Sequence, residues 1–83
     1  GNKIGVFLEV GCETDFVAKT DEFQKLGKEL AMQVVANKPS SVEELLDQEY
    51  VRDPSKKIQE LIKEVIGKLG ENLAVTDFEI VVI

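Results

Sequence analysis

The sequence predicts an α+β domain, with a small antiparallel β-sheet and two main helices packed on one face of it. Segments rich in β-branched and aromatic residues lie near both ends of the chain, and two longer segments between them repeat apolar residues at three- and four-residue steps. Pairing of the end segments into a sheet would give both apolar helix stripes a face to cover. With 83 residues, the chain is expected to form one domain with a single modest core.

The first expected strand covers residues 3–10. Its core-facing positions share one parity, and they are Ile4, Val6, Leu8 and Val10. Gly11 ends this strand. Residues 12–19 follow without a sustained period, so we interpret them as a connector.

A helix is predicted over residues 21–36, because its apolar residues fall on one stripe. The stripe consists of Phe23, Leu26, Gly27, Leu30, Ala31, Val34 and Val35. Thr20 or Asp21 is expected to cap the first turn, and Pro39 follows the last turn. Gly27 has a low helix propensity, which suggests the close approach of another backbone segment at this point.

The middle of the chain predicts a short helix over residues 42–47, since Ser41 and Glu44 have the spacing of a capping box. Residues 48–52 are expected to be extended. The order of elements is therefore strand, helix, short element, helix and strand once the last two segments are added.

The second main helix is predicted over residues 54–69. Asp53 is a favourable N-cap residue, and Pro54 would lose no hydrogen bond at the first helical position. The apolar stripe consists of Ile58, Leu61, Ile62, Val65, Ile66 and Leu69. Gly70 is expected at the left-handed position after the helix, and a closing strand over residues 73–82 follows.

The composition argues against several classes of function. Sixteen acidic and ten basic residues give a net charge of −6, so a nucleic acid is not an expected partner. No run approaches the roughly 18 apolar residues of a membrane span, so a membrane is not an expected partner either. The chain has no histidine, which removes the commonest general base and zinc ligand. Cys12, the single cysteine, suits a reducing compartment.

Three carboxylates lie close together in the sequence, at Glu9, Glu13 and Asp15. They would suit a magnesium site or an acid–base pair. Their spacing is generic, and a strand followed by a loop would splay them apart, so we interpret them as surface charge. Cys12 is interpreted as a small apolar filler at a strand end, because no histidine is present to activate it. An enzyme that uses Glu13 and Asp15 would lack a base, a nucleophile and a cofactor motif, so no enzymatic activity, metal or cofactor is expected.

The segment Thr14-Asp15-Phe16-Val17 allows two interpretations. In the first, Thr14 or Asp15 caps a turn and Phe16 fills the core. In the second, Phe16 protrudes and enters a pocket of a partner, beside a carboxylate that competes for the partner's hydrogen bonds. Exposure of Phe16 would distinguish the two interpretations, because large aromatic side chains without a polar group are ordinarily buried.

The segment 5–18 resembles the signature of the elongation factor Ts family, with the sequence Gly-Val-Phe-Leu-Glu-Val-Gly-Cys-Glu-Thr-Asp-Phe-Val-Ala. Further stretches resemble the family in the same order, at residues 21–23, 29–34, 45–53, 60–64 and 70–73. The resemblance therefore extends over nearly the whole chain.

The resemblance implies a guanine-nucleotide exchange factor that binds elongation factor Tu, in its GDP-bound and nucleotide-free forms, and promotes GDP release without covalent chemistry. Thr14, Asp15, Phe16 and Val17 would bind this partner, with Asp15 and Phe16 placed close to its magnesium and nucleotide site. Magnesium bridges the phosphates of GDP, so its displacement would loosen the nucleotide. The implied location is the cytoplasm or the interior of an organelle.

Residues 1–83 resemble only the core, or dimerization, part of the family, as a single domain. The small helical module with which family members begin has no counterpart here, and residues 39–44 stand in place of a much longer insert. Gly11 and Glu49 replace the usual asparagine and proline, and the closing strand lacks the usual arginines.

A structural or self-association module of the same lineage, without exchange activity of its own, is the alternative function. The apolar residues 80–83 would then offer a strand edge for pairing. The net charge of −6 opposes the close approach of two copies. A homodimer, if formed through this edge, is expected to be weak.

Overall fold

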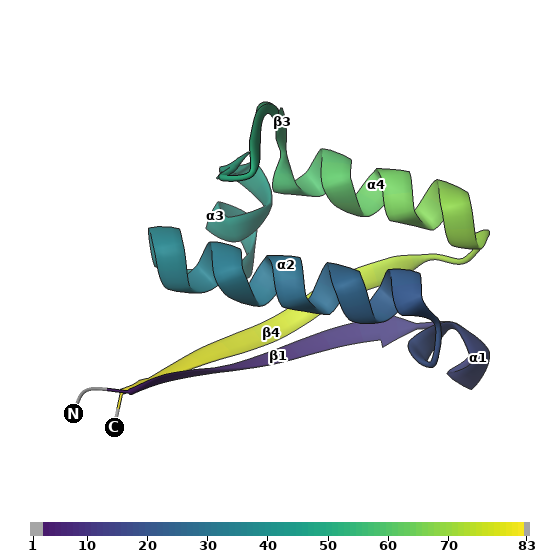
Figure 1. Cartoon of the computed structure of the whole chain (residues 1–83), viewed down its shortest axis with the longest axis horizontal. Coiled ribbons are helices and arrows are strands. Elements are labelled where there is room, and N and C mark those ends of the chain that lie inside the picture. The colour runs from purple at the N-terminus through teal and green to yellow at the C-terminus, as the bar shows by residue number, and fades with distance from the viewer. Residues whose placement is uncertain (1–2, 83) are drawn as a thin grey trace.

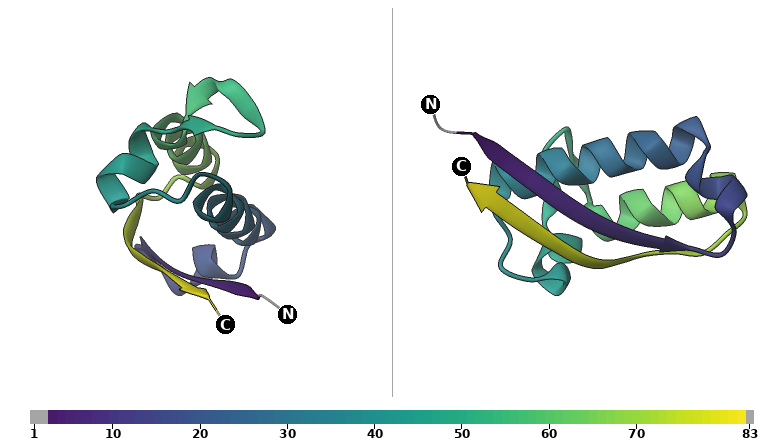
Figure 2. Two further views of the ribbon diagram at one scale, coloured as in Figure 1. Left: turned by 90° about the vertical axis from the view of Figure 1, so that its left-hand side faces the viewer. Right: turned by 90° about the horizontal axis from the view of Figure 1, so that it is seen from below.

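The computed structural model describes residues 3–82 and confirms the α+β class (Figure 1). Strands β1 (Ile4–Cys12) and β4 (Leu73–Val82) form an antiparallel sheet. Helices α2 (Asp21–Asn37) and α4 (Ile58–Leu69) lie side by side on the same face of this sheet, as the three views in Figures 1 and 2 show. The predicted pairing of the end segments and the predicted cover by two helices are both confirmed.

The register of the sheet places Ile4 opposite Val82 and Cys12 opposite Leu73. A bulge between Glu9 and Val10 interrupts this register by one residue of β4. The core-facing parity of β1 is confirmed at three of its four predicted positions, because Val6, Leu8 and Val10 pack against the core. Ile4 differs from the expectation, since its side chain is 47% exposed.

The core lies between the sheet and the two helices and extends under the middle segment. Its buried apolar members are Val17, Leu26, Leu30, Val34, Leu45, Tyr50, Ile58, Ile62, Val65, Leu73 and Val75. Helix α2 begins as predicted, because the side chain of Thr20 accepts a hydrogen bond from the backbone N–H of Phe23. The close backbone approach predicted at Gly27 is wrong, since a Cβ at this position would meet no atom within 4 Å.

Helix α3 (Val42–Asp47) has the predicted range and the predicted N-cap, in which Ser41 Oγ accepts from the backbone N–H of Glu44. The carboxylate of Glu44 turns to Ser40 and accepts from both its backbone N–H and its hydroxyl. These hydrogen bonds hold the pKa of Glu44 below its ordinary value.

The start predicted for the second main helix is wrong by four residues. Residues Asp53–Lys57 form strand β3, which pairs with the two-residue strand β2 (Glu49–Tyr50), and α4 begins only at Ile58. Asp53 does not cap a helix, because its carboxylate accepts from the backbone N–H and hydroxyl of Ser55 within the hairpin. The carboxylate of Glu60 caps α4 through the backbone N–H of Lys57. Gly70 ends α4 in the left-handed conformation, as predicted.

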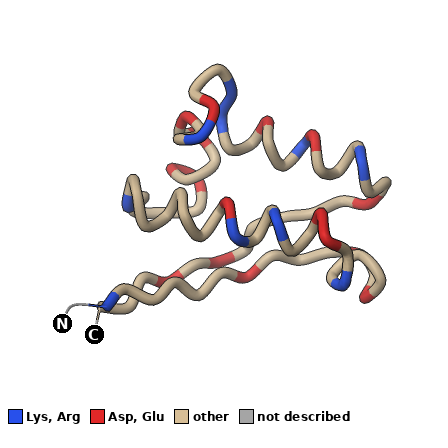
Figure 3. The backbone as a smooth tube through the Cα atoms, in the orientation of Figure 1, with Lys and Arg blue, Asp and Glu red and all other residues tan. Residues whose placement is uncertain are grey.

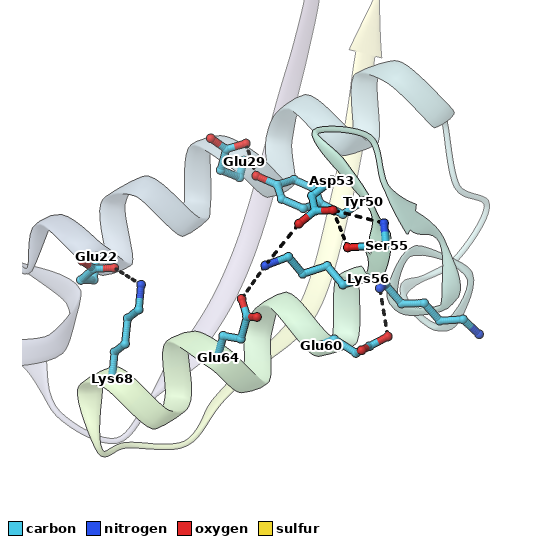
Figure 4. A network of polar contacts seen from close by, with 10 residues as sticks. Glu22, Glu29, Tyr50, Asp53, Ser55, Lys56, Glu60, Glu64 and Lys68 are labelled. Atoms are coloured by element: carbon cyan, nitrogen blue, oxygen red, sulfur yellow. Dashed lines mark hydrogen bonds and ion pairs between the residues drawn. The ribbon is translucent and has the colours of Figure 1, made fainter.

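Buried polar groups attach the β2–β3 hairpin to α2. Gln33 is fully buried, and its amide donates to Gln48 Oε1 and to the carbonyl of Glu49 while accepting from the backbone N–H of Val51. One turn earlier, Glu29 accepts a 2.6 Å hydrogen bond from Tyr50 (Figure 4).

These bonds hold the hairpin against α2, and its residues Tyr50 and Lys56 help to line the groove between α2 and α4. Arg52 donates to the other carboxylate oxygen of Glu29 at 2.9 Å. Burial and the hydrogen bond to Glu29 raise the pKa of Tyr50 to about 12. Further along the same groove, Lys68 and Glu22 approach each other across α4 and α2. Within residues 3–82, no helix is long and apolar enough to cross a membrane.

Candidate functional site

The segment that joins β1 to α2 projects from one end of the molecule (Figure 1). We call residues 12–20 the corner. The predicted connector contains one helical turn, α1 (Asp15–Ala18), which the sequence did not predict because a single turn is too short to show a period. The turn is closed by hydrogen bonds from the backbone N–H groups of Lys19 and Thr20 to the carbonyls of Phe16 and Val17.

Phe16 and Val17 are neighbours on α1 but differ in exposure. Phe16 is 85% exposed, the largest exposure among the large apolar side chains of the described residues, whereas Val17 is 5% exposed and belongs to the core. The interpretation in which Phe16 fills the core is therefore wrong, and the expectation that Phe16 is accessible is confirmed. Val17 is the residue that anchors the corner in the core.

Two carboxylates fix the start of α1 to the turn between α4 and β4. The backbone N–H of Thr14 donates to Glu71 Oε1 at 2.9 Å, and the hydroxyl of Thr14 donates to the other oxygen of the same carboxylate. In return, Glu13 accepts a 3.0 Å hydrogen bond from the backbone N–H of Asn72. Each of these two segments thus supplies a carboxylate that accepts a hydrogen bond from a backbone N–H of the other. Thr14 makes no capping hydrogen bond to α1 with its side chain, and its hydroxyl donates to Glu71.

The other end of α1 is fixed to α2. Thr20 Oγ1 donates to the carbonyl of Val17 at 2.7 Å and accepts from the N–H of Phe23 at 3.2 Å. Gln24 donates to the carbonyl of Ala18 at 2.8 Å. The backbone of α1 is therefore held on both sides, which leaves the Phe16 ring as a projecting group on a fixed base.

Asp15 lies beside Phe16 at the start of α1 and is exposed. Within the part of the chain that the structure describes, its carboxylate accepts no hydrogen bond and forms no ion pair. An unused carboxylate next to an exposed aromatic ring is the combination that the second interpretation of this segment requires. Figure 3 shows acidic positions at this end of the molecule and along both strands of the sheet.

The neighbouring carboxylates of Glu9 and Glu13 accept hydrogen bonds from other residues of the chain. Glu9 accepts from the hydroxyl of Thr76, and Glu13 accepts from Asn72. Among residues 3–82, no group of three acidic, histidine or cysteine side chains is arranged to hold a metal ion. Cys12 is half-buried, packs against the core and donates from its thiol to the carbonyl of Thr14 at 3.2 Å.

Glu71 and Asn72 are the site residues that sequence reasoning did not single out. They lie 57 and 59 positions from their partners, so no local period relates them to the corner. One signal in the sequence could have found them. Gly70 predicts a turn, and because the strand that follows it pairs antiparallel with β1, this turn has to lie beside the end of β1.

The comparisons with known proteins all find the same family. A family model described as Elongation factor TS matches residues 13–83. Elongation factor Ts of Herpetosiphon aurantiacus is 37% identical over 123 aligned positions, which include 94% of this chain and 62% of that protein. Chloroplastic elongation factor Ts of Guillardia theta is 36% identical, with 95% of this chain and 57% of that protein covered. Elongation factor Ts of a Nostoc species is 49% identical over 78 residues, or 94% of this chain and 24% of that protein.

The chain spans less than two thirds of the length of these relatives. The first two alignments extend over 123 and 125 positions, although the chain has only 83 residues. These two relatives therefore carry residues within the matched stretch that have no counterpart here. The alignment with the Nostoc protein has 78 positions and shows no such excess.

Proposed function

The chain belongs to the elongation factor Ts family, and from this premise we propose that it acts in translation elongation, by binding elongation factor Tu and promoting the release of GDP. The observation that supports this proposal most directly is the exposure of Phe16 on the corner. An exposed aromatic ring on a fixed backbone is the typical anchor of a protein interface.

Phe16 would supply most of the binding free energy from the corner. Burial of its ring in an apolar pocket of the partner is worth about 2–3 kcal/mol. Because hydrogen bonds on both sides already hold α1, little conformational entropy is lost when the ring docks. Val17 would contribute indirectly, by anchoring α1 in the core, and Thr14 by its bonds to Glu71.

Asp15 would act on the nucleotide site of the partner. Its free carboxylate enters beside the Phe16 ring, close to the magnesium ion that bridges the phosphates of GDP in the partner. A new negative charge there disfavours the phosphates and competes for the groups that hold the ion. By linkage, GDP weakens the binding of this chain by the same factor by which the chain weakens GDP. Nucleotide-free elongation factor Tu is then the form bound most tightly, and no covalent step is required of the chain.

The 83 residues would act as one core domain of this factor. The relatives include bacterial proteins and a chloroplastic one, so we propose the bacterial cytoplasm or the interior of an organelle as its location.

The proposal is tested by mixing the chain with elongation factor Tu that carries a fluorescent GDP analogue. Phe16→Ala is expected to slow GDP release at least about tenfold, the loss typical of an interface anchor. Asp15→Asn keeps the shape of the side chain and is also expected to slow release. The matched controls are Val51→Ala, an exposed apolar residue of the β2–β3 turn, and Glu43→Gln, an exposed acid of α3. Both controls should release GDP at the parent rate.

Binding to nucleotide-free elongation factor Tu is the second readout, for the case in which the 83 residues bind without accelerating release. Phe16→Ala should then weaken binding by a similar factor. If neither Phe16→Ala nor Asp15→Asn changes either quantity relative to the controls, the corner is not the binding site. A parent chain that does not bind elongation factor Tu at all would favour the alternative function, a structural or self-association module.

A further inference from the structure

The second half of α1 is fixed by the core and by α2. Val17 is buried in the core, and Thr20 donates a hydrogen bond to its carbonyl. Gln24 of α2 donates to the carbonyl of Ala18. These contacts begin at Val17, so the first residue of α1 has to be held in another way.

The residues between the end of β1 and α1 are held by the turn between α4 and β4. Thr14 directly precedes Asp15, and both its backbone N–H and its hydroxyl donate to the carboxylate of Glu71. Glu13 accepts from the backbone N–H of Asn72, which keeps this turn beside the corner. The ladder between β1 and β4 ends before Glu13 and Thr14 and does not reach them.

Asp15 has no contact of its own that fixes the direction of its side chain. Its carboxylate is exposed, and within residues 3–82 it accepts no hydrogen bond and forms no ion pair. The direction of such a side chain follows from the backbone that carries it. For Asp15, this backbone is fixed on one side by Thr14, and therefore by Glu71.

We propose that Glu71 is the positioning residue for Asp15, and that it sets the rate of GDP release without contacting the partner. This inference rests on the proposed function and divides it between the two halves of the corner. Phe16, fixed through Val17, determines how tightly elongation factor Tu is bound. Asp15, fixed through Thr14 and Glu71, determines how fast the bound partner loses GDP.

The two side chains differ in how precisely they have to be placed. Burial of the Phe16 ring in an apolar pocket is non-directional, so a small shift of the backbone costs little binding free energy. A carboxylate that competes for the groups around a metal ion has to reach one position, and a displacement of about 1 Å can cost a large factor in rate. Loss of the Thr14–Glu71 contact should therefore affect the rate much more than the affinity.

The contact can be kept while the charge of Glu71 is removed. Glu71 is half-buried, and its two oxygens accept from the N–H and the hydroxyl of Thr14. In Glu71→Gln, the amide oxygen can accept from the N–H while the amide NH₂ donates to the hydroxyl oxygen. Glu71→Ala has no group that can do either. The pair of variants thus separates position from charge.

The rate of GDP release is measured over a range of chain concentrations, which separates the maximal rate from the concentration that gives half of it. Glu71→Ala should lower the maximal rate about threefold to tenfold and change the half-saturating concentration less than about twofold. Glu71→Gln should stay within about twofold of the parent in both quantities. Phe16→Ala should mainly raise the half-saturating concentration.

Glu44→Ala is the matched control. Glu44 accepts from the backbone N–H and the hydroxyl of Ser40, as Glu71 does from Thr14, but it lies on α3, away from the corner (Figure 1). Glu44→Ala should lose a similar pair of hydrogen bonds and still release GDP at the parent rate. An equal loss of rate in this control would show that Glu71 acts only through stability. A Glu71→Gln variant as slow as Glu71→Ala would assign the effect to charge, and either result would overturn the inference.

Double variants test whether Glu71 acts through Asp15. Glu71→Ala should not slow release further in an Asp15→Asn background, whereas in a Phe16→Ala background it should lower the maximal rate by the same factor as in the parent. The same loss in both backgrounds would contradict the inference. If Asp15→Asn slows release and Glu71→Ala does not, the inference alone fails. If Asp15→Asn leaves release unchanged, the role proposed for Asp15 fails and the inference fails with it.

Backbone relaxation of the free chain, measured by NMR, tests the positioning without the partner. In Glu71→Ala, the order parameter of the Asp15 amide should fall from about 0.85 to below about 0.6, while that of Ala18 stays near 0.85. Glu71→Gln and Glu44→Ala should keep the parent value at Asp15. An unchanged order parameter at Asp15 in Glu71→Ala would overturn the inference, whatever the rate of GDP release.

Discussion

The backbone N–H of Thr14 donates a 2.9 Å hydrogen bond to the carboxylate of Glu71, so the first residue before α1 is attached to the turn that leads into β4. The hydroxyl of Thr14 donates to the same carboxylate. The corner is thus stabilised by a contact between opposite ends of the sequence, and the position of Phe16 depends on it.

Glu71→Ala is expected to loosen the corner without unfolding the domain. Loss of two hydrogen bonds to a partly exposed carboxylate should cost about 1–2 kcal/mol of unfolding free energy, measured by urea denaturation. Amide hydrogen exchange at Thr14 should become faster, while exchange in the middle of α4 should become faster only as far as the loss of global stability requires. Glu43→Ala is the control and should change neither quantity, because this exposed acid has no hydrogen-bond or ion-pair partner among residues 3–82. Unchanged protection at Thr14 would contradict the role given to Glu71.

Phe16 and Val17 are neighbours in the chain but should respond differently to truncation. Phe16→Ala removes a ring that is 85% exposed and should cost less than about 0.5 kcal/mol of unfolding free energy. Val17→Ala leaves a cavity in the core and should cost about 2 kcal/mol. Thermal unfolding measures both, since about 1 kcal/mol corresponds to about 4–8 °C in a domain of this size. A large loss of stability in Phe16→Ala would show that the Phe16 ring packs in the core, which would contradict its exposure.

Gly27 and Gly70 should also respond in opposite directions to alanine. Gly27 lies inside α2, and a Cβ there would meet no atom within 4 Å, so Gly27→Ala should stabilise the domain by about 0.5–1 kcal/mol through helix propensity. Gly70 has φ +71, so Gly70→Ala should destabilise it by about 1–2 kcal/mol. The two melting temperatures should therefore move to opposite sides of the parent value. Destabilisation by Gly27→Ala would show a close contact that the structure lacks.

Tyr50 should make the stability fall at alkaline pH. Its pKa is raised from about 10 in the unfolded chain to about 12 in the folded protein, so its contribution is complete below pH 10 and is lost as the pH rises to about 12. Tyr50 is the only tyrosine, so phenolate absorbance during a pH titration reports this group alone. The unfolding free energy should decline less steeply over this interval in Tyr50→Phe. A phenolate pKa near 10 in the folded protein would contradict the buried bond to Glu29.

The sequence predicted most of the main helices and the paired strands, because these elements carry their own signals. The alternation around Val6 and the stripe around Leu30 are each long enough to specify a strand and a helix. The β2–β3 hairpin was missed, since Asp53-Pro54 has the local chemistry of a helix start and only long-range contacts decide its conformation. The stripe itself begins at Ile58, where the helix begins, and was the better indicator of the boundary.

Part of the candidate site was also open to prediction. The exposure of Phe16 was foreseen as one of two interpretations, but the residues alone did not decide between them. The choice depends on Val17, which takes the core position, and on Glu71, which reaches Thr14 only after β4 has paired with β1. Groups that are brought together by the register of a sheet leave no periodic trace in the sequence.

The pairing of Ile4 with Val82 brings the two ends of the described chain together at one end of the sheet, and the corner lies at the other end (Figure 1). A polypeptide attached at either end therefore leaves the molecule on the side remote from Phe16. Domains with adjacent ends tolerate insertion into a host loop and circular permutation. With this geometry the domain can be repeated in tandem or inserted into another protein, and each copy would still expose its Phe16 ring.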